Sequence, residues 1–211
     1  MIISAKRNYV FVHIPKTGGT SLATVLEERA AADDILIGDT PKAQRRKKRL
    51  ANLRAPGRLW KHSTLADVDG LYRRDAFVLT LVRNPWDRMV SYYHWLRAQS
   101  FSHSAVRAAK TLSFRDFLKD PQVQRAVRGN PYASYVTAPD GRERCNLFAR
   151  IEVADDLGPF WQHLGFELSI PYLNKSDRRA DWRSYYDVET FEIVRQLAGT
   201  DIKRFGYDTQ L

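Results

Sequence analysis

The stretch VHIPKTGGTS, residues 12–21, decides the fold, because two adjacent glycines join a short apolar run to an amphipathic segment. Glycines lack a Cβ, so backbone N–H groups can converge on an anion, and a helix N-terminus behind them adds unpaired donors. The lysine of the common nucleotide-binding loop follows the last glycine, whereas Lys16 precedes both Gly18 and Gly19. The stretch therefore predicts a phosphate loop of a different type.

The segments on either side of this loop predict the first half of a βαβ unit. Residues 9–14, YVFVHI, are typical of a strand buried on both faces. An amphipathic pattern then predicts a helix over about 21–32, with Thr20 or Ser21 as its N-cap. A plainer interpretation also stays open, namely a Gly-Gly turn beside a surface lysine.

A second strand-to-helix turn follows residues 76–82, AFVLTLV, which predict another buried strand. The strand runs into Arg83, after which Asn84 is a favourable N-cap and Pro85 suits the first helical position. A stripe at helical spacing predicts a long amphipathic helix, with Trp86, Met89, Val90, Tyr93 and Leu96 as its apolar members. Two such turns predict an α/β fold, a P-loop-type parallel sheet flanked by helices.

The rest of the chain is less regular and adds fewer elements. We expect a further strand at 147–152 (LFARIE), a turn or hairpin at 135–145, and helices at 112–120, 157–165 and 187–199. A length of 211 residues predicts one domain spanning 1–211, with a basic insertion at about 40–61.

The charge balance indicates anionic partners, because 34 Lys and Arg against 24 Asp and Glu give a net charge of +10. The cations concentrate between Asp39 and Asp67, where no acidic residue occurs. Two interpretations stay open for this basic segment. It is either a solvated face or an electrostatic landing surface for an anionic acceptor.

Cysteine and hydropathy bear on the compartment. Cys145 is the only cysteine, so no intrachain disulfide is possible and a reducing compartment is favoured. No apolar run approaches the roughly 20 residues that span a membrane. We therefore expect a cytoplasmic protein without a transmembrane anchor.

The second turn offers a second phosphate site. Arg83 can fold its guanidinium toward the Ser91 hydroxyl, although Asp87 and Arg88 pairing at the surface beside a solvated Ser91 is an alternative. Ligands of open α/β sheets gather at the carboxyl ends of the strands. The two turns together therefore predict a nucleotide phosphorylated at two places. The second strand ends in Arg83, not in a magnesium-holding Asp, so we expect a reaction without a metal.

Five motifs now carry a resemblance. HIPKTGGTS, KHST, LVRNPWDRMVSYYH, RIE and YLNKS occur in this order, and together they resemble the Golgi-type carbohydrate sulfotransferase family and its bacterial relatives. The resemblance runs from about Tyr9 to Tyr207. It implies 3′-phosphoadenosine 5′-phosphosulfate (PAPS) as the co-substrate, a hydroxyl group as the acceptor, and no metal requirement.

The resemblance also implies roles for individual residues. It places Lys16 beside the 5′-phosphosulfate, and Arg83 and Ser91 at the 3′-phosphate. Lys175, in YLNKS, is expected to close over the nucleotide. The 5′-phosphate is expected to be cradled by the loop residues Thr17, Gly18, Gly19, Thr20 and Ser21.

Sulfuryl transfer resembles phosphoryl transfer in its in-line geometry, so positioning and electrostatics should supply most of the catalysis. Lys16 is the candidate that stabilises the leaving oxygen. The acceptor hydroxyl needs a base, and His62 matches the position of the base that the resemblance implies. Glu152 is the alternative base, although we interpret it chiefly as a buried partner of a site cation. For His13 we expect a packed core role.

Two other functions stay open. One is a nucleotide-dependent kinase with a variant phosphate loop, which would need a metal. The other is a non-enzymatic polyanion-binding module, whose affinity would follow charge and fall steeply with salt. Within the sulfotransferase hypothesis we expect a carbohydrate or glycolipid acceptor, such as an anionic glycan or lipid-linked sugar, and no nucleic acid partner. The sequence leaves acceptor identity and oligomeric state open.

Overall fold

A computed structural model describes residues 1–171 and 178–211. The described residues form two compact units. The first comprises residues 1–82 and 132–171, and the second comprises residues 83–131 and 178–211. Each unit contains its own cluster of buried apolar side chains, so each is described by itself.

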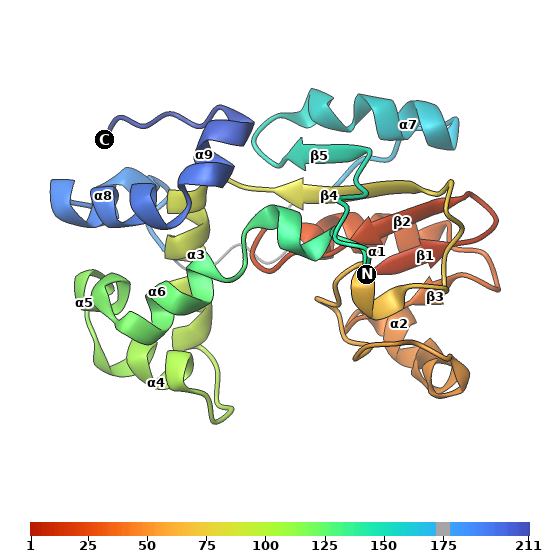
Figure 1. Cartoon of the computed structure of the whole chain (residues 1–211), viewed down its shortest axis with the longest axis horizontal. Coiled ribbons are helices and arrows are strands. Elements are labelled where there is room, and N and C mark those ends of the chain that lie inside the picture. The colour runs from red at the N-terminus through yellow and green to blue at the C-terminus, as the bar shows by residue number, and fades with distance from the viewer. Residues whose placement is uncertain (172–177) are drawn as a thin grey trace. The chain divides into compact units, whose positions relative to one another are not determined.

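The first unit contains a five-stranded sheet in the order β3-β1-β2-β4-β5 (Figure 1). Its strands are β1 (Ile2–Ser4), β2 (Tyr9–Val12), β3 (Ile35–Leu36), β4 (Phe77–Val82) and β5 (Leu147–Arg150). The neighbours β2, β4 and β5 are parallel, as predicted, whereas β1 pairs antiparallel with both β2 and β3. The α/β fold is confirmed, and the sheet is mixed because two short strands extend its parallel part.

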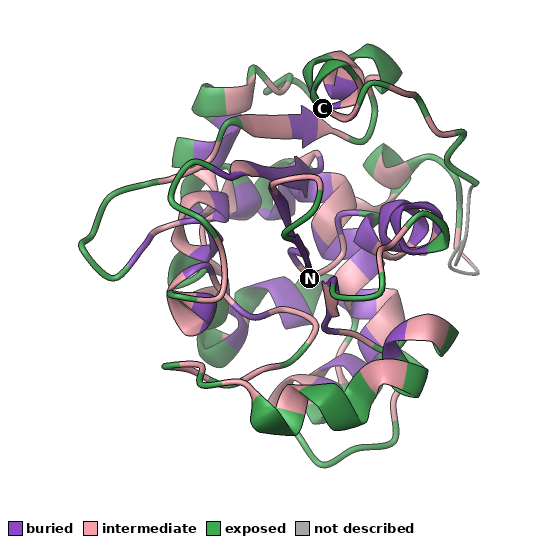
Figure 2. Cartoon of the chain, turned by 90° about the vertical axis from the view of Figure 1, so that its right-hand side faces the viewer, coloured by how far each residue is buried: buried purple, intermediate pink, exposed green. Residues whose placement is uncertain are grey.

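The parallel register brings three strand ends to one edge. Val12 lies opposite Thr80, and Val82 lies opposite Arg150. In an α/β sheet this carboxyl edge is where ligands gather. Every residue of β1 and β2 is buried, and Figure 2 shows these strands in purple. The sheet is thus a buried support for the loops that leave its edge.

Two helices share one core with a face of this sheet. They are α1 (Gly19–Glu28) and α7 (Gly158–Leu164), and their apolar side chains cluster with those of the strands. The Phe160 ring contacts both Tyr9 and Phe77, with centroids 5.3 Å and 5.8 Å apart. The N-cap predicted for α1 was wrong. Gly18 caps the helix in a left-handed conformation without a side-chain bond, because the loop enters the helix earlier than Thr20.

The basic segment forms α2 (Pro41–Arg46) and the 3₁₀ helix η1 (Lys47–Asn52). Lys42 donates to the Glu27 carbonyl near the end of α1. Arg46 Nη1 donates to the Ala31 carbonyl at 2.7 Å, and Arg49 Nη1 donates to the Ala32 carbonyl at 2.5 Å. Helix ends and the turns after them leave carbonyls in need of donors. Three cations of this segment therefore have a structural role, while the exposed ones include Arg45, Lys47, Lys48, Arg54 and Arg58.

Shorter elements complete the first unit. They are the 3₁₀ helices η2 (Ala66–Val68), η3 (Tyr132–Tyr135) and η4 (Ala154–Leu157). An isolated antiparallel bridge joins Thr137 to Glu143, as expected for the predicted turn or hairpin.

The second unit is helical and begins with the predicted amphipathic helix α3 (Pro85–Arg97). The Asn84 side chain accepts hydrogen bonds from the N–H groups of Trp86 and Asp87, as an N-cap should. The predicted apolar stripe is buried, and the Trp86 ring stacks on Phe191 with centroids 4.4 Å apart. The other elements are α4 (Ser104–Thr111), α5 (Phe114–Lys119), α6 (Pro121–Arg128), η5 (Trp182–Tyr185), α8 (Val188–Leu197) and α9 (Gly199–Phe205).

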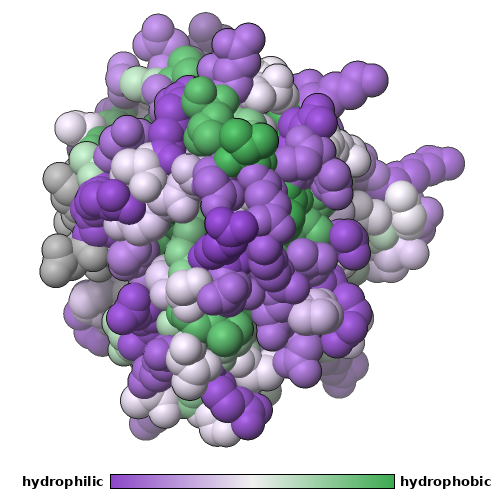
Figure 3. All heavy atoms as spheres, turned by 90° about the vertical axis from the view of Figure 1, so that its left-hand side faces the viewer, coloured by the Kyte–Doolittle hydropathy of each residue, from purple (hydrophilic) through white to green (hydrophobic). Residues whose placement is uncertain are grey.

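The surface fits the basic, polar composition. Figure 3 shows one face that is mostly hydrophilic, with small separate apolar areas. Within residues 1–171 and 178–211, no helix has the length and apolar character needed to cross a membrane.

Candidate active site

The phosphate loop leaves β2 and returns as α1. Lys16 and Gly18 both adopt positive φ angles, 66° and 74°. The left-handed conformation costs a residue with a side chain about 1–2 kcal/mol, so Lys16 holds its position against local strain. Thr17 is fully buried, and its hydroxyl donates to the Ile14 carbonyl at 2.9 Å. That bond engages the Thr17 side chain within the loop and leaves its backbone N–H as the group suited to a ligand.

The two glycines are needed for different reasons. Gly18 is exposed and uses its freedom to adopt positive φ. At Gly19 the constraint is space, because an added Cβ would lie 2.2 Å from Cδ2 of His13. His13 is 7% exposed, which confirms its packed role. The His13 ring therefore packs directly against the first residue of α1.

His62 contacts His13, although the two residues are 49 positions apart in the sequence. Its Nδ1 is 2.7 Å from the His13 carbonyl oxygen, and the two rings meet edge to face at 4.9 Å. A carbonyl only accepts, so the proton sits on Nδ1 and the Nε2 lone pair can take a proton. Burial lowers the pKa of His62 to about 4 and also lowers that of His13. Both imidazoles are consequently neutral at pH 7.

The RIE motif reaches the same loop from β5. The Ile151 side chain lies 3.6 Å from the position that a Cβ on Gly18 would occupy. The Ile151 N–H also bonds to the Val82 carbonyl at 3.0 Å, which fixes the turn after the strand. Glu152 is exposed, so the prediction that it is buried was wrong, whereas its pairing with a site cation stays a prediction. The first unit thus brings together the phosphate loop, His62 and the RIE turn.

In the second unit, the predicted residue Arg83 belongs to a largely buried ion-pair group. Asp87 receives Arg83 Nε at 2.7 Å on one carboxylate oxygen and Arg178 Nη2 at 2.6 Å on the other. The side chains of both arginines are about one-tenth exposed. Ser91, one helical turn after Asp87, is 4% exposed. The alternative of a surface Asp87–Arg88 pair beside a solvated Ser91 was therefore wrong.

Arg178 was not predicted from the sequence. The only local signal was its place in the polar run KSDRRADW, and its partner Asp87 is 91 residues away. Lys175, predicted to close over the nucleotide, lies outside the described residues.

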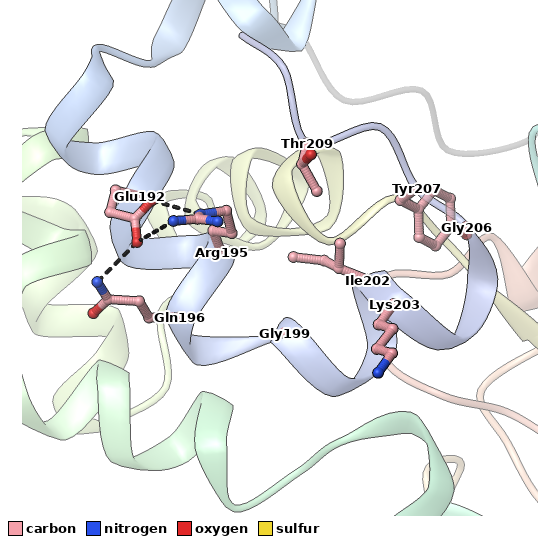
Figure 4. Close-up of a pocket in the computed structure, with 9 residues that line it drawn as sticks. All are labelled: Glu192, Arg195, Gln196, Gly199, Ile202, Lys203, Gly206, Tyr207 and Thr209. Atoms are coloured by element: carbon pink, nitrogen blue, oxygen red, sulfur yellow. Dashed lines mark hydrogen bonds and ion pairs between the residues drawn. The ribbon is translucent and has the colours of Figure 1, made fainter.

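A pocket of about 670 Å³ lies in the second unit, between α8, α9 and the segment after them. Figure 4 shows the Glu192 carboxylate bonded to Arg195 and Gln196 at one side of it. Its lining consists of Glu192, Arg195, Gln196, Gly199, Ile202, Lys203, Gly206, Tyr207 and Thr209. None of these is a predicted site residue, so this pocket is separate from the candidate site. Among the residues that the structure describes, no group of three or more His, Cys, Asp or Glu could hold a metal ion.

A phosphate loop at the carboxyl edge of parallel strands, with a neutral imidazole beside it, is typical of a group-transferring enzyme. A sulfotransferase family model matches residues 1–153, and the chain belongs to this family. A crystal structure of mouse sulfotransferase SULT7A1 complexed with PAP resembles the chain with a TM-score of 0.53 at 14% identity. The match covers 98% of this chain and 91% of that one.

A search of curated proteins found no match. Family and fold support an enzyme that transfers sulfate.

Proposed function

We propose that the protein transfers a sulfuryl group from PAPS to a hydroxyl of a carbohydrate or glycolipid acceptor. One observation carries the proposal: within the first unit, the neutral His62 contacts His13, whose ring supports Gly19 of the phosphate loop. In this proposal, the base and the phosphate-binding loop are therefore both in contact with the His13 side chain. The resemblance to a sulfotransferase complexed with PAP supports the choice of nucleotide.

The loop residues suit the 5′ side of PAPS. Backbone N–H groups at Gly18, Gly19 and the first turn of α1 would bind the 5′-phosphate, with hydroxyls from Thr20 and Ser21. Thr17 would contribute its N–H, since its hydroxyl is engaged with Ile14. PAPS would supply the activated sulfuryl group. In the second unit, Arg83 and Ser91 would bind the 3′-phosphate, and Lys175 would close over the nucleotide.

In the proposed reaction, His62 takes the acceptor proton on Nε2 while its Nδ1–H stays on the His13 carbonyl. That hydrogen bond fixes the tautomer and the ring orientation. Lys16 places its charge where the leaving oxygen becomes negative. No residue in this scheme requires a metal. We also propose a cytoplasmic location, because the single Cys145 suits a reducing compartment.

The proposal is tested with ³⁵S-labelled PAPS and an extract of the source cells, with identification of the labelled product. His62→Ala should bind adenosine 3′,5′-bisphosphate (PAP) normally and lose about 10²–10⁴ in rate. Lys16→Ala should weaken both binding and turnover. His163→Ala, an exposed histidine in the same unit, is the control and should resemble the wild type. If His62→Ala keeps its turnover and Glu152→Gln loses it, Glu152 is the base.

The nucleotide assignment has a separate test in the absence of any acceptor. PAP should raise the melting temperature more than adenosine 5′-monophosphate does. Arg83→Ala should weaken PAP binding about tenfold to a hundredfold, because it removes a charge-assisted contact, and should leave the monophosphate unaffected. Equal binding of the two nucleotides would contradict a 3′-phosphate site. Transfer from ATP that depends on magnesium would favour a kinase instead.

A further inference from the structure

Trp60 is an exposed aromatic residue beside the proposed base. The residue is 43% exposed, yet its ring meets His62 edge to face with centroids 5.1 Å apart. The guanidinium carbon of Arg58 lies 5.5 Å from the centroid of the same indole ring, within the range of a cation–π contact. An aromatic surface, a cation and a neutral imidazole therefore adjoin one another within the first unit.

The buried side chain of Ser63 holds the turn that carries Arg58, Trp60 and His62. Ser63 is fully buried, and its hydroxyl accepts a hydrogen bond from the Trp60 N–H at 2.9 Å. The same hydroxyl is 2.8 Å from the Arg58 carbonyl oxygen. His62 is held by the His13 carbonyl. The Trp60 ring is thus exposed on a turn whose backbone is held by hydrogen bonds.

We propose that Trp60 and Arg58 form an acceptor subsite, which binds the pyranose ring of an anionic sugar next to His62. The weakly positive C–H face of a pyranose suits the negative face of an indole, by the same electrostatics that attract cations to aromatic rings. Arg58 supplies a forked donor for a carboxylate or sulfate on the sugar. The role of His62 in this proposal rests on the proposed function.

Position and charge favour a sugar over other occupants. With 5.1 Å between the indole and imidazole centroids, one sugar ring can touch Trp60 while a hydroxyl reaches His62. A nucleic acid would also stack on an aromatic residue, but the adjacent base calls for a substrate that presents ring hydroxyls. The same unit carries further exposed cations, among them Arg45, Lys47 and Lys48, and their charge favours an anionic glycan over a neutral one.

The test measures binding without PAPS, so it does not depend on turnover. The probes are a hyaluronan tetrasaccharide, neutral chitotetraose, a polyglutamate peptide that has charge without sugar rings, and oligo(U). Hyaluronan should bind most tightly. Trp60→Ala should weaken hyaluronan and chitotetraose about tenfold and leave polyglutamate unchanged. Arg58→Gln should weaken hyaluronan and polyglutamate, which both carry carboxylates, and leave neutral chitotetraose unchanged.

Two further variants sharpen the result. Trp60→Phe should retain most of the hyaluronan affinity, because it keeps an aromatic face. Phe101→Ala removes an aromatic side chain of similar exposure, 48%, from the second unit and should change nothing. Melting curves for each variant establish that it is folded. Absence of hyaluronan binding, equal affinity in Trp60→Ala, or tighter binding of oligo(U) would overturn the subsite.

The experiments distinguish a failure of the subsite proposal from a failure of the proposed function. Hyaluronan binding that is lost in Trp60→Ala, together with no sulfate transfer to any acceptor, would support the subsite and contradict the sulfotransferase. Sulfate transfer with an unchanged acceptor KM in Trp60→Ala and Arg58→Gln would keep the enzyme and overturn the subsite.

Discussion

The two units carry candidate anion sites of opposite construction. The phosphate loop of the first unit is built from backbone, with positive φ at Lys16 and Gly18 and no space for a Cβ at Gly19. The candidate site of the second unit is built from charged side chains, because Asp87 forms ion pairs with both Arg83 and Arg178. A backbone site is damaged by adding an atom, whereas a side-chain site is damaged by removing a charge.

The largest effect is expected from Asp87→Asn. The substitution keeps the shape but removes the charge that two buried guanidinium groups share. Breaking a buried ion pair typically costs about 3–5 kcal/mol, and urea denaturation should show a loss of that size. Asp140→Asn breaks an exposed pair with Arg144 and is the matched control, with no measurable loss expected.

The same variant sharpens the comparison when nucleotide is added. PAP should restore part of the stability of Asp87→Asn if Arg83 binds the 3′-phosphate, and the 5′-monophosphate should not. A stability equal to that of the control would show that Asp87 is not the counter-ion. The denaturation curves also test the prediction of a single domain, which expects one cooperative transition for the whole chain.

A smaller loss is expected from adding one methyl group to the loop. Gly19→Ala places a Cβ 2.2 Å from the His13 ring, and overpacking of this kind costs about 1–3 kcal/mol. PAP binding should fall with it, because the donors at the start of α1 move. The cost of Gly19→Ala should shrink in a His13→Ala background, which a double-mutant cycle measures. Equal costs in both backgrounds would mean that the ring is not the obstacle.

The smallest effect concerns pH. Burial holds the folded pKa of His62 at about 4, against 6.5 when unfolded, and lowers that of His13 as well. Between these two pH values the unfolded chain binds protons that the folded chain does not. The contribution of His62 to the free energy of unfolding is therefore fully present above about pH 6.5 and decreases as the pH falls toward 4.

Melting temperatures recorded from pH 5 to 8 check this slope. His62→Asn should flatten the acid part of the curve, because one of the two imidazoles with a lowered pKa is removed. His103→Asn replaces an exposed histidine and should leave the wild-type slope. An unaltered slope in His62→Asn would contradict a lowered pKa of His62. For the proposed enzyme, the acid limb of kcat/KM should likewise lie well below pH 6.5.

Local chemistry explains what was predictable. The strand predicted at 76–82 is β4, and the Asn84 cap and the buried stripe of α3 were also confirmed, since periodicity and capping act over a few residues. Strands β1 and β3, with three and two residues, are too short to show a period and were missed. The helix start at Gly19 was missed because the backbone of the loop, not a side chain, caps α1.

The candidate site divides along the same line. By itself the sequence determined the glycine loop between a strand and a helix, the Arg83 turn and the family, because each depends on residues that are neighbours in the chain. Only the tertiary structure decided that His13 supports Gly19, that Trp60 adjoins His62, and that Arg178 shares Asp87. These contacts depend on how distant segments fold against one another, and pairwise burial and charge compensation leave no periodic signature in a single sequence.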